Sequence, residues 1–474
     1  MADPFSLLPL VLAAHGGRVD DFPAEQLVAA GVAILQRSAT LVRALSGRRS
    51  AILLPTSPQF FVALAASEGR GAVLINPLAS RPEIVHQLRD SNVGAVFTNV
   101  ALAAHLPDGV THVLLDDAPR QATVVGNGTA RTVDLGTHFG LSLEGEADAP
   151  GSDEEAAVVY TSAMAGTPLG AILTHRNLLA NAHATVEAVG NSSDDRVLAL
   201  LPFAHLFGLT VTASAPLLSG AAVTTMAKFN PNRAAEIIAS GQITEVVGVP
   251  SVYRALLSAI EKGGSRRDNA RGALRVCICG GSPLAVPLQD RWFKATGIEL
   301  RQGYGLTEAG PVCLFNRVDR PNVRGSLGVP YPGVEVRLGD ECEIQIRGDN
   351  VFRGYVSGGE NGLAVSDDWL HTGDVGRRGA ADTIAFQLVL KPMFTRNGFN
   401  IYPRELEAVI GELAGVDTVR VSSGEHVERE ADIVVEYTGV ATPDEVRAWC
   451  LRRLSAYKQP TVVRKMAAGA QVRA

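Results

Sequence analysis

A run of small and hydroxyl residues in the first half of the chain is the first feature that could do chemistry. Thr161 and Ser162 belong to an apolar run that begins at Val158, and a helix cap is expected near Thr174 or Asn177. Backbone N–H groups and hydroxyls in a loop between a strand and a helix can contact phosphate oxygens. An ordinary flexible loop has the same composition, so this stretch by itself leaves the phosphate site open.

A second candidate is the glycine-rich segment around Tyr304. Gly303 and Gly305 permit a tight backbone, and the ring of Tyr304 could stack on a flat base. Thr307 can donate a hydrogen bond to a phosphate oxygen, and Glu308 can hold Mg²⁺, which prefers carboxylate and phosphate oxygens. The alternative is a glycine-rich turn beside a buried tyrosine.

Two separate polar residues complete the set. Asp374 ends the stretch Trp369-Leu-His-Thr-Gly-Asp374, and a carboxylate in a tight glycine turn can accept hydrogen bonds from two ribose hydroxyls. The alternative is that Asp374 only forms a turn. His205 lies among apolar residues, where a histidine is more often a satisfied core residue than a functional one.

Strands and helices alternate through the elements that must position these residues. Apolar strands separated by helices indicate an α/β fold with a parallel sheet covered on both faces. The predicted strands are residues 50–55, 71–76, 93–98, 196–201, 245–249 and 274–279, and the predicted helices include 59–68 and 82–90.

The pattern changes in the last third of the chain. Residues 334–338 and 342–347 alternate between apolar and polar, which predicts short antiparallel strands. From about Leu390 the chain reads as a small α+β domain. Its predicted elements after the first strand are a helix at 403–413, strands at 418–422 and 431–437, and a helix at 442–454.

Bulk properties exclude some classes of function. The net charge of -6 gives no reason to expect nucleic acid as a partner. The first residues lack the basic start of a signal peptide, and no apolar run is long enough to cross a bilayer. The five cysteines show no metal-binding spacing, so we expect a reduced, cytoplasmic protein.

Together the four motifs resemble those of the AMP-forming acyl-CoA synthetases, which are related to luciferases and peptide-synthetase adenylation domains. Their order and spacing match across nearly the whole chain. We therefore expect a large N-terminal domain at residues 1–388, with two stacked α/β sheets and a small β-barrel near 334–355. A mobile α+β domain at 389–474 should follow a hinge near Leu388. Further stretches that support the resemblance are residues 279–284, 325–333, 346–355 and 398–407.

The resemblance implies a role for particular residues. Tyr304 should stack on adenine, Thr307 should touch the α-phosphate, Glu308 should hold magnesium and Asp374 should hold the ribose. His205 should border the acyl pocket. The remaining expected nucleotide contacts are Thr161, Ser162, Gly281, Ser282, Pro283, Gly303 and Gly305. The other expected pocket residues are Val249, Pro250, Gly280 and Gly305, and those of the CoA channel are Lys391, Arg396 and Gly398.

The chain departs from the family where positive charge is usual. The family's phosphate loop reads Tyr-Thr-Ser-Gly-Thr-Thr-Gly-x-Pro-Lys-Gly, but here residues 163–165 are Ala-Met-Ala and Leu169 replaces the lysine. Leu388-Val389 replaces the usual charged hinge pair. The family's terminal lysine aligns with Ala470, and no lysine follows Lys465. Since one transition-state donor is often worth about 3–4 kcal/mol, such losses could slow adenylation greatly.

Three interpretations remain open. In the first, the protein uses substitute cations. Lys391, Arg396, Lys458 and Lys465 are the candidates, and we favour Lys465 because the tail after Tyr457 is expected to be mobile. In the second, it runs altered chemistry, on an unusual acid or a nitrogen oxyanion, or only the thioester half-reaction. In the third, it is a weakened module that binds a nucleotide or an acyl group.

The first of these interpretations is the one we predict. ATP, with Mg²⁺, activates a carboxylic acid as acyl-adenylate, and CoA or a carrier thiol then displaces AMP. The wall at residues 246–253 has no lysine or arginine, so we expect an apolar acyl or aromatic acid. A homodimer is kept as an option.

Overall fold

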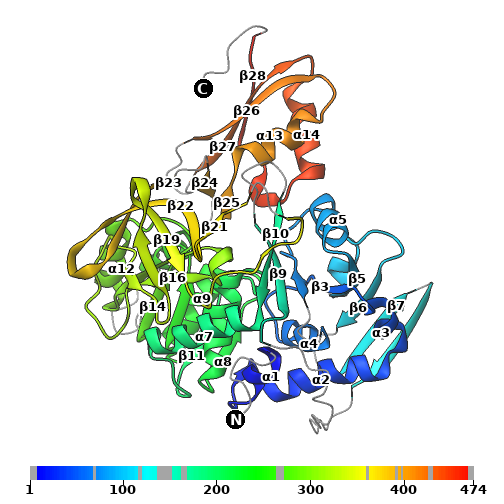
Figure 1. Ribbon diagram of the computed structural model, residues 1–474, viewed down its shortest axis with the longest axis horizontal. Helices are drawn as coiled ribbons and strands as arrows, with labels where there is room; N and C mark the ends of the chain where they lie inside the picture. The colour runs from blue at the N-terminus through cyan, green and yellow to red at the C-terminus, as the bar shows by residue number, and fades with distance from the viewer. Residues whose placement is uncertain are drawn as a thin grey trace.

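Two nine-stranded sheets form the centre of the large N-terminal region (Figure 1). The structure is a computed structural model. It describes residues 8–67, 71–115, 120–126, 128–135, 152–161, 168–262, 272–358, 362–389, 393–396, 399–424 and 431–467.

The first sheet has a parallel centre and antiparallel edges. The parallel strands are β9, β4, β3, β5 and β6. This arrangement confirms the parallel α/β class predicted from the apolar runs. In spatial order the strands are β20 (Gly354–Tyr355), β10 (Leu169–Thr174), β9 (Glu155–Thr161), β4 (Ala72–Leu74), β3 (Arg49–Ile52), β5 (Val93–Thr98), β6 (Thr111–Leu115), β7 (Gln121–Gly126) and β8 (Thr129–Asp134).

The second sheet repeats this plan. Six neighbouring strands, from β15 to β1, are parallel, while β16, β17 and β2 are antiparallel additions. In spatial order the strands are β17 (Val329–Pro330), β16 (Val312–Phe315), β15 (Leu300–Gly305), β14 (Val276–Cys279), β13 (Glu245–Gly248), β11 (Arg196–Ala199), β12 (Ala222–Thr225), β1 (Arg18–Val19) and β2 (Phe22–Pro23).

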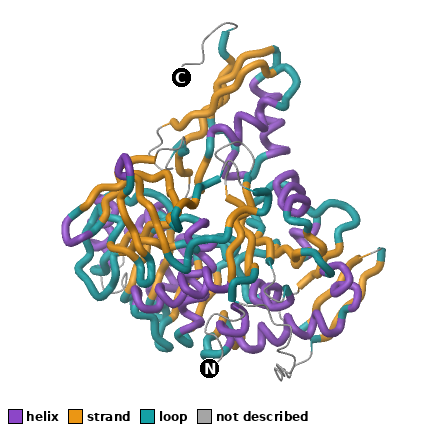
Figure 2. Tube along the Cα trace, in the orientation of Figure 1, coloured by secondary structure: helices purple, strands orange, loops and turns teal. Residues whose placement is uncertain are grey.

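Helices and a π-helical segment surround and separate these sheets (Figure 2). The cap predicted near Thr174 or Asn177 is confirmed, because Thr174 and Asn177 form a reciprocal capping box at the start of α7. The helices are α1 (Leu8–Ala13), α2 (Ala24–Arg37), α3 (Ala39–Leu45), α4 (Gln59–Ala66), α5 (Arg81–Asp90), α6 (Val100–Ala103), α7 (His175–Val189), η2 (Phe207–Ser214), α8 (Ala215–Leu218), α9 (Pro231–Ala239), α10 (Pro250–Lys262), α12 (Val286–Thr296) and the short turn η3 (Thr307–Ala309).

The length and apolar composition of the described helices bear on whether one of them could cross a membrane. Taken singly, none of them is long and apolar enough to cross a membrane, although the bent pair α2 and α3 reaches the required length and composition together.

A third, antiparallel sheet stands where the small β-barrel was expected. Its strand β22 pairs with β19 on one edge and with both β21 and β23 on the other. The pairings among the described residues leave this sheet open, so the barrel expectation is corrected. The strands are β18 (Glu335–Leu338), β19 (Glu343–Arg347), β21 (Val365–Ser366), β22 (Trp369–Arg378) and β23 (Ile384–Val389), with turns η4 (Asp340–Cys342) and η5 (Ala380–Asp382).

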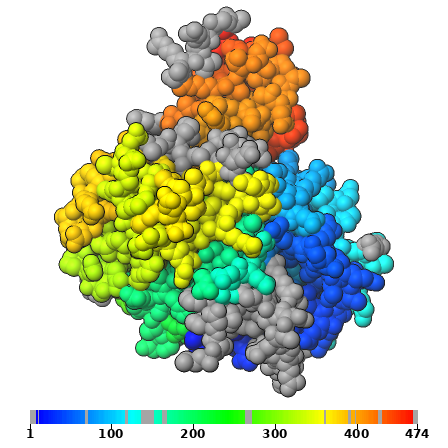
Figure 3. All heavy atoms as spheres, viewed as in Figure 1, coloured from blue at the N-terminus to red at the C-terminus, as the bar shows by residue number. Residues whose placement is uncertain are grey.

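The C-terminal unit stands as a separate lobe above the large region (Figure 3). It has its own apolar core, against which Phe394 is the first residue packed, whereas Phe386 is the last on the large core. The boundary at residue 388 stays a prediction. The elements are β24 (Phe394–Arg396), β25 (Phe399–Ile401), α13 (Pro403–Gly411), β26 (Val416–Gly424), β27 (Asp432–Gly439), α14 (Pro443–Arg453), η6 (Ala456–Lys458) and β28 (Val462–Lys465).

A buried carboxyl lies at the base of the second sheet, away from the strand ends that form the site. Glu245 begins β13 and is fully buried, and its Oε2 accepts a hydrogen bond of 2.7 Å from Asn191 Nδ2. Its Oε1 and the Asn191 Oδ1 have no hydrogen-bond partner among the described residues. Burial, moderated by the positive charge of Arg275, raises the pKa of Glu245 to about 8. The fold therefore favours a protonated Glu245.

The substitution Glu245→Gln should make stability less sensitive to alkaline pH. The folded pKa lies above the unfolded value, so the stabilising effect is complete below about pH 4.5 and is lost as pH rises to about 8. Glutamine keeps the bond from Asn191 and carries no charge at any pH. The free energy of unfolding of Glu245→Gln, relative to that of the wild type, should therefore rise by roughly 3–5 kcal/mol across that range. Urea unfolding at pH 5 and pH 8.5 measures this, and equal differences at both pH values would contradict it.

Candidate active site

One cavity of about 860 Å³ collects most of the residues predicted from the sequence. It lies at the carboxyl ends of the parallel strands of the large region and extends to the C-terminal lobe. Ligands of open α/β sheets usually bind at this edge. The predicted residues that line it are Thr161, His205, Gly280, Gly281, Ser282, Pro283, Gly303, Tyr304, Gly305, Thr307, Glu308, Asp374 and Lys458.

Two neighbouring strands explain why these residues meet. β14 ends at Cys279, directly before Gly280, and the adjacent β15 ends at Gly305, directly before the turn that holds Thr307. A side chain cannot replace Gly305, because a Cβ there would lie 1.8 Å from the carbonyl oxygen of Pro311. Gly281 has a φ of +77°, which a residue with a side chain rarely adopts.

The predicted base and ribose residues are in direct contact. Tyr304 donates a hydrogen bond of 2.6 Å to Asp374 Oδ2, and the Asp374 backbone N–H bonds to Thr372 Oγ1. Burial, followed by the negative charge of Asp374, raises the pKa of Tyr304 well above its usual range. Tyr304 is therefore a permanent donor, and a carboxylate has further lone pairs for ribose hydroxyls.

The substitution Asp374→Ala should weaken AMP binding at least about tenfold, which is roughly 1.4 kcal/mol. It removes the acceptor for the ribose and also leaves the Tyr304 hydroxyl without its partner. Calorimetric titration with AMP measures the affinity, and Asp417→Ala, an exposed aspartate on β26, is the matched control. Unchanged affinity in the Asp374 variant would remove Asp374 from the nucleotide site.

Glu308 is held in place at the cavity wall. Its Oε1 accepts a 2.8 Å hydrogen bond from Tyr355, and its backbone oxygen accepts one from Phe352. Burial, and then the charge of Glu308, raises the pKa of Tyr355, so the hydroxyl stays protonated. No group of three or more His, Cys, Asp and Glu side chains among the described residues could hold a metal. One carboxylate beside substrate phosphates fits Mg²⁺, which usually keeps several waters.

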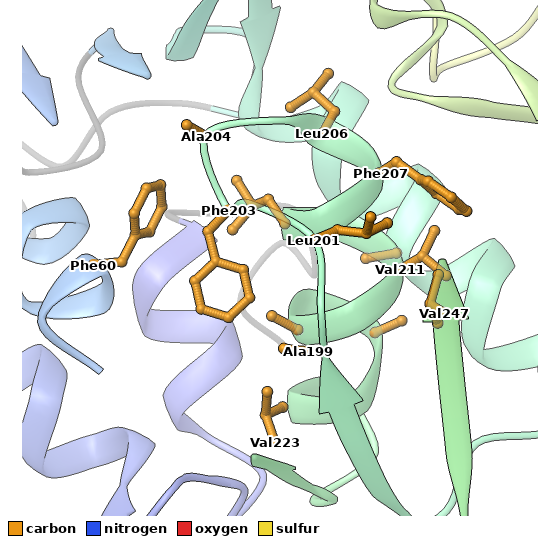
Figure 4. Close-up of a cluster of buried hydrophobic side chains, with 14 of the residues drawn as sticks. Phe60, Ala199, Leu201, Phe203, Ala204, Leu206, Phe207, Val211, Val223 and Val247 are labelled. Carbon is orange, nitrogen blue, oxygen red and sulfur yellow. The ribbon is translucent and has the colours of Figure 1, made fainter. Parts of the chain in front are cut away.

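His205 is not the core residue that its apolar neighbours suggested. The side chain is exposed and lines the cavity, while Phe203 and Leu206 around it are buried (Figure 4). Phe203 packs edge-on against Phe60, with ring centroids 5.6 Å apart, which anchors the turn. The His205 surface is open to the cavity, but the many protein atoms that surround the cavity disfavour the charged ring and lower the pKa of His205. Nδ1 accepts a hydrogen bond from the Phe207 N–H, so the neutral ring carries its proton on Nε2.

The apolar wall of the cavity differs from the predicted one. Val249 and Pro250 are buried and are not among the residues that line the cavity, so the structure does not bring them to it. Val249 directly follows β13 and Pro250 begins α10, and both pack into the core instead. The wall is formed by Phe207, Val211, Ile278, Val312, Phe315, Leu327 and Tyr331.

The described ends of the phosphate loop border the cavity. Thr161 at the end of β9 pairs with Leu169 at the start of β10, and both line the cavity. Leu169 thus places an apolar side chain where the family has lysine. His86 on α5 lies 3.2 Å from the Pro168 carbonyl oxygen and supports this end of the loop. The predicted contact Ser162 and the changed residues 163–165 lie outside the described residues.

The C-terminal lobe also contributes to the cavity. Phe399, Asn400 and Tyr402 line it together with Glu308 and Asp374. Burial, and then the negative charges of Glu308 and Asp374, raises the pKa of Tyr402, so its hydroxyl stays protonated. The lobe is therefore docked so that its 399–402 segment faces the nucleotide residues.

The predicted CoA-channel and catalytic cations are mostly placed elsewhere. Arg396 is buried, and its guanidinium donates to the carbonyl oxygens of Tyr457 and Gln459, so it braces the lobe and does not line the cavity. Lys465 does not line the cavity either. It belongs to β28, which pairs with β27, and its Nζ donates to the Val440 carbonyl oxygen. The tail expected to be mobile is thus a strand as far as Lys465. Lys391 and Gly398 lie outside the described residues.

Several residues at the cavity were not predicted. Phe207 and Val211 are spaced by four on the buried π-helical segment, a spacing that the sequence shows but does not distinguish from core packing. Glu83 and His86 on α5 had no motif of their own, and only tertiary structure brings them to the cavity.

Comparison with known proteins agrees with the geometry. The model of the AMP-binding enzyme family matches residues 36–356, which confirms the resemblance seen in the motifs. The chain is 31% identical over 441 residues to a feruloyl-CoA synthase of Amycolatopsis sp, covering 88% of this chain and 84% of the relative. It is 28% identical over 460 residues to a long-chain-fatty-acid–CoA ligase of Bacillus subtilis (strain 168), covering 87% and 81%.

A solved structure shares the whole architecture. A malonyl-CoA ligase in a ternary product complex with methylmalonyl-CoA and AMP superimposes with a TM-score of 0.77. The match covers 96% of each chain at 24% sequence identity, so the likeness concerns the fold.

Proposed function

Because the chain belongs to the AMP-binding enzyme family and is an AMP-forming acid–thiol ligase, we propose that it joins an apolar or aromatic carboxylic acid to CoA. The observation that carries the proposal is the single cavity. Thr307, Glu308 and Asp374 border it from the large region, and Asn400 and Tyr402 border it from the C-terminal lobe. A cavity bordered by both domains supports a site at which the nucleotide and the incoming thiol meet.

In the first step, a carboxylate oxygen of the acid attacks the α-phosphorus of ATP. The new O–P bond forms as the bond to pyrophosphate breaks, and pyrophosphate leaves. Tyr304 and Asp374 hold the adenosine, and Thr307 donates to the α-phosphate. Glu308 would hold Mg²⁺, which when bound neutralises phosphate charge.

In the second step, the thiol sulfur attacks the acyl carbon. The C–S bond forms, the bond from the acyl carbon to the phosphate oxygen breaks, AMP leaves and the thiol proton passes to water. Negative charge develops on the acyl oxygen, and a fixed donor there lowers the barrier. The protonated Nε2 of neutral His205 is the donor that we assign to this oxygen.

The acid class follows from the wall of the cavity. Its side chains are aliphatic or aromatic, and the Lys and Arg side chains that line the described cavity are Arg453 and Lys458, both in the C-terminal lobe. A second carboxylate would therefore lack a partner in the wall. The names of two relatives, for feruloyl and long-chain fatty acyl groups, support the same class.

A second function is favoured by one observation, the leucine at position 169. Without a lysine there, the step that handles triphosphate is weakened, whereas the AMP contacts are kept. Transfer from a ready-made acyl-adenylate is therefore the alternative to the complete reaction. Mg²⁺ at Glu308, a carrier-protein thiol in place of CoA, a homodimer and a cytoplasmic location also stay predictions.

A panel of acids tests the proposal. The purified chain is incubated with ATP, Mg²⁺, CoA and one acid, and thioester is measured by chromatography. Decanoate, benzoate or cinnamate should give kcat/KM values at least about tenfold above malonate and succinate, which is about 1.4 kcal/mol in transition-state binding. Preference for a dicarboxylate would overturn the acid class, and thioester only from supplied acyl-adenylate would favour the second function.

A further inference from the structure

A buried lysine joins the two domains at one side of the cavity. The Lys458 side chain is 5% exposed, and its Nζ lies 2.8 Å from Glu83 Oε1 on α5 of the large region. The same Nζ contacts Glu405 Oε1 on α13 of its own lobe. The ion pair between Lys458 and Glu83 therefore crosses from one domain to the other.

Two further contacts lie beside this pair. Ser80, the N-cap of α5, donates a 2.9 Å hydrogen bond to the carbonyl oxygen of Arg453 at the end of α14. Ser455 Oγ lies 3.4 Å from Glu83 Oε1. The first turn of α5 is thus the surface on which this side of the C-terminal lobe rests.

Each charged group of the Lys458–Glu83 contact has a second partner within its own domain. Glu83 also accepts a 2.7 Å bond from the Ser80 N–H in the capping box of α5, and both groups of this bond belong to the large region. Lys458 keeps Glu405. Burial by itself lowers the pKa of Lys458, but the neighbouring Tyr457, Glu405 and Glu83 outweigh it and raise the pKa, so the lysine stays charged.

The position of the lobe depends on such contacts. The lobe has its own core and is joined to the large region through the few residues after β23. A buried ion pair often adds little stability, but removing one partner is strongly unfavourable. A pair of this kind can specify how two bodies are arranged even where it adds little stability.

We infer that Glu83 is a positioning residue, whose pair with Lys458 holds the lobe where Asn400 and Tyr402 face the cavity. The assignment of this arrangement to acyl transfer rests on the proposed function, whereas the contact itself does not. Loss of Glu83 should therefore slow transfer and leave adenylation nearly unchanged.

The substitution Glu83→Gln tests this inference with little risk to folding. Glutamine can still accept the Ser80 N–H bond of a capping box, so only the charge that faces Lys458 is lost. Thioester formation from supplied decanoyl-adenylate and CoA should fall at least about tenfold. ATP–pyrophosphate exchange should change less than about threefold. Glu83→Asp keeps the charge on a shorter side chain, so its rate of thioester formation should lie between those of the wild type and Glu83→Gln.

A fluorescence measurement reads the arrangement directly. Cys342 is exposed and the other four cysteines are buried, so Cys342 and an introduced Val440→Cys can be labelled as a donor–acceptor pair. Glu83→Gln should shift the energy-transfer distribution away from the wild-type one. The matched control is Glu261→Gln, which breaks an exposed ion pair with Arg291 inside the large region and should shift nothing.

The two failures can be told apart. If the wild type makes no thioester but Glu83→Gln still shifts the energy-transfer distribution, the proposed function fails and the positioning role stands. If Glu83→Gln leaves both the distribution and the transfer rate within twofold of wild type, Glu83 does not position the lobe.

Discussion

Replacing Leu169 with lysine should raise the rate of acid-dependent ATP–pyrophosphate exchange at least about tenfold. Leu169 lines the cavity opposite Thr161, where the resemblance places a lysine that faces the triphosphate. One fixed donor at a developing charge is commonly worth about 10²–10³ in rate, so a tenfold gain is the lower bound for an added cation. Exchange of labelled pyrophosphate into ATP, with decanoate present, measures the step.

The neutral variant Leu169→Gln is the control for this gain. It has a polar side chain at the same position but no charge, so it should remain near the wild-type rate. A lysine variant no faster than the glutamine variant would show that the apolar loop does not limit adenylation. The replacement of the loop lysine by Leu169 would then not explain slow adenylation.

Replacing Glu308 with glutamine should lower adenylation at least about 100-fold. The amide can still accept the hydrogen bond from Tyr355, so the turn that carries residue 308 is preserved and the negative charge is removed. The loss should be much smaller for transfer from supplied acyl-adenylate, because no pyrophosphate leaves in that step. Pyrophosphate exchange and calorimetric titration of Mg²⁺ in the presence of ATP measure the rate and the ion affinity.

Tyr355→Phe separates the charge of Glu308 from its positioning. This variant keeps the carboxylate. It removes the bond to Glu308 and the 3.1 Å bond that the Tyr355 hydroxyl accepts from the Leu363 N–H, each with a net worth of about 1 kcal/mol. It should therefore lose far less exchange activity than Glu308→Gln. Equal losses in the two variants would mean that the orientation of residue 308 matters and its charge does not.

The fold was largely predictable because local pattern and tertiary packing agree. Strands that are buried on both faces, such as β4, β5 and β14, are nearly continuous apolar runs in the sequence. The N-cap Thr174 likewise has a local signature. The openness of the third sheet was not predictable, because it depends on how β21 and β23 share one edge of β22.

The grouping of the proposed nucleotide residues in one cavity was predictable because they follow strand ends, while their role stays a prediction. Gly280–Pro283 and Thr307–Glu308 come after adjacent parallel strands, so topology alone brings them together. The acyl wall was not, because Val249 and Phe207 are both apolar residues near strand ends and only packing decides which one faces the cavity.

The cations were the least predictable part. Arg396 and Lys458 look alike as basic residues of the C-terminal lobe, yet one braces backbone carbonyls and the other pairs with a carboxylate of another domain. Sequence separation hides this, because Glu83 and Lys458 are 375 positions apart. The tail after Tyr457 was expected to be mobile, but Val462–Lys465 forms β28, which pairs with β27. The catalytic role of Lys465 stays a prediction.

The stoichiometry of products tests the central claim most directly. The purified chain is given ATP, Mg²⁺, CoA and decanoate, and AMP, pyrophosphate and decanoyl-CoA are measured in the same sample over time. An acid-activating ligase should release one AMP and one pyrophosphate for each thioester formed, and nothing should form without the acid. Bound nucleotide with no AMP and no thioester, from acid and ATP or from supplied decanoyl-adenylate, would contradict the account.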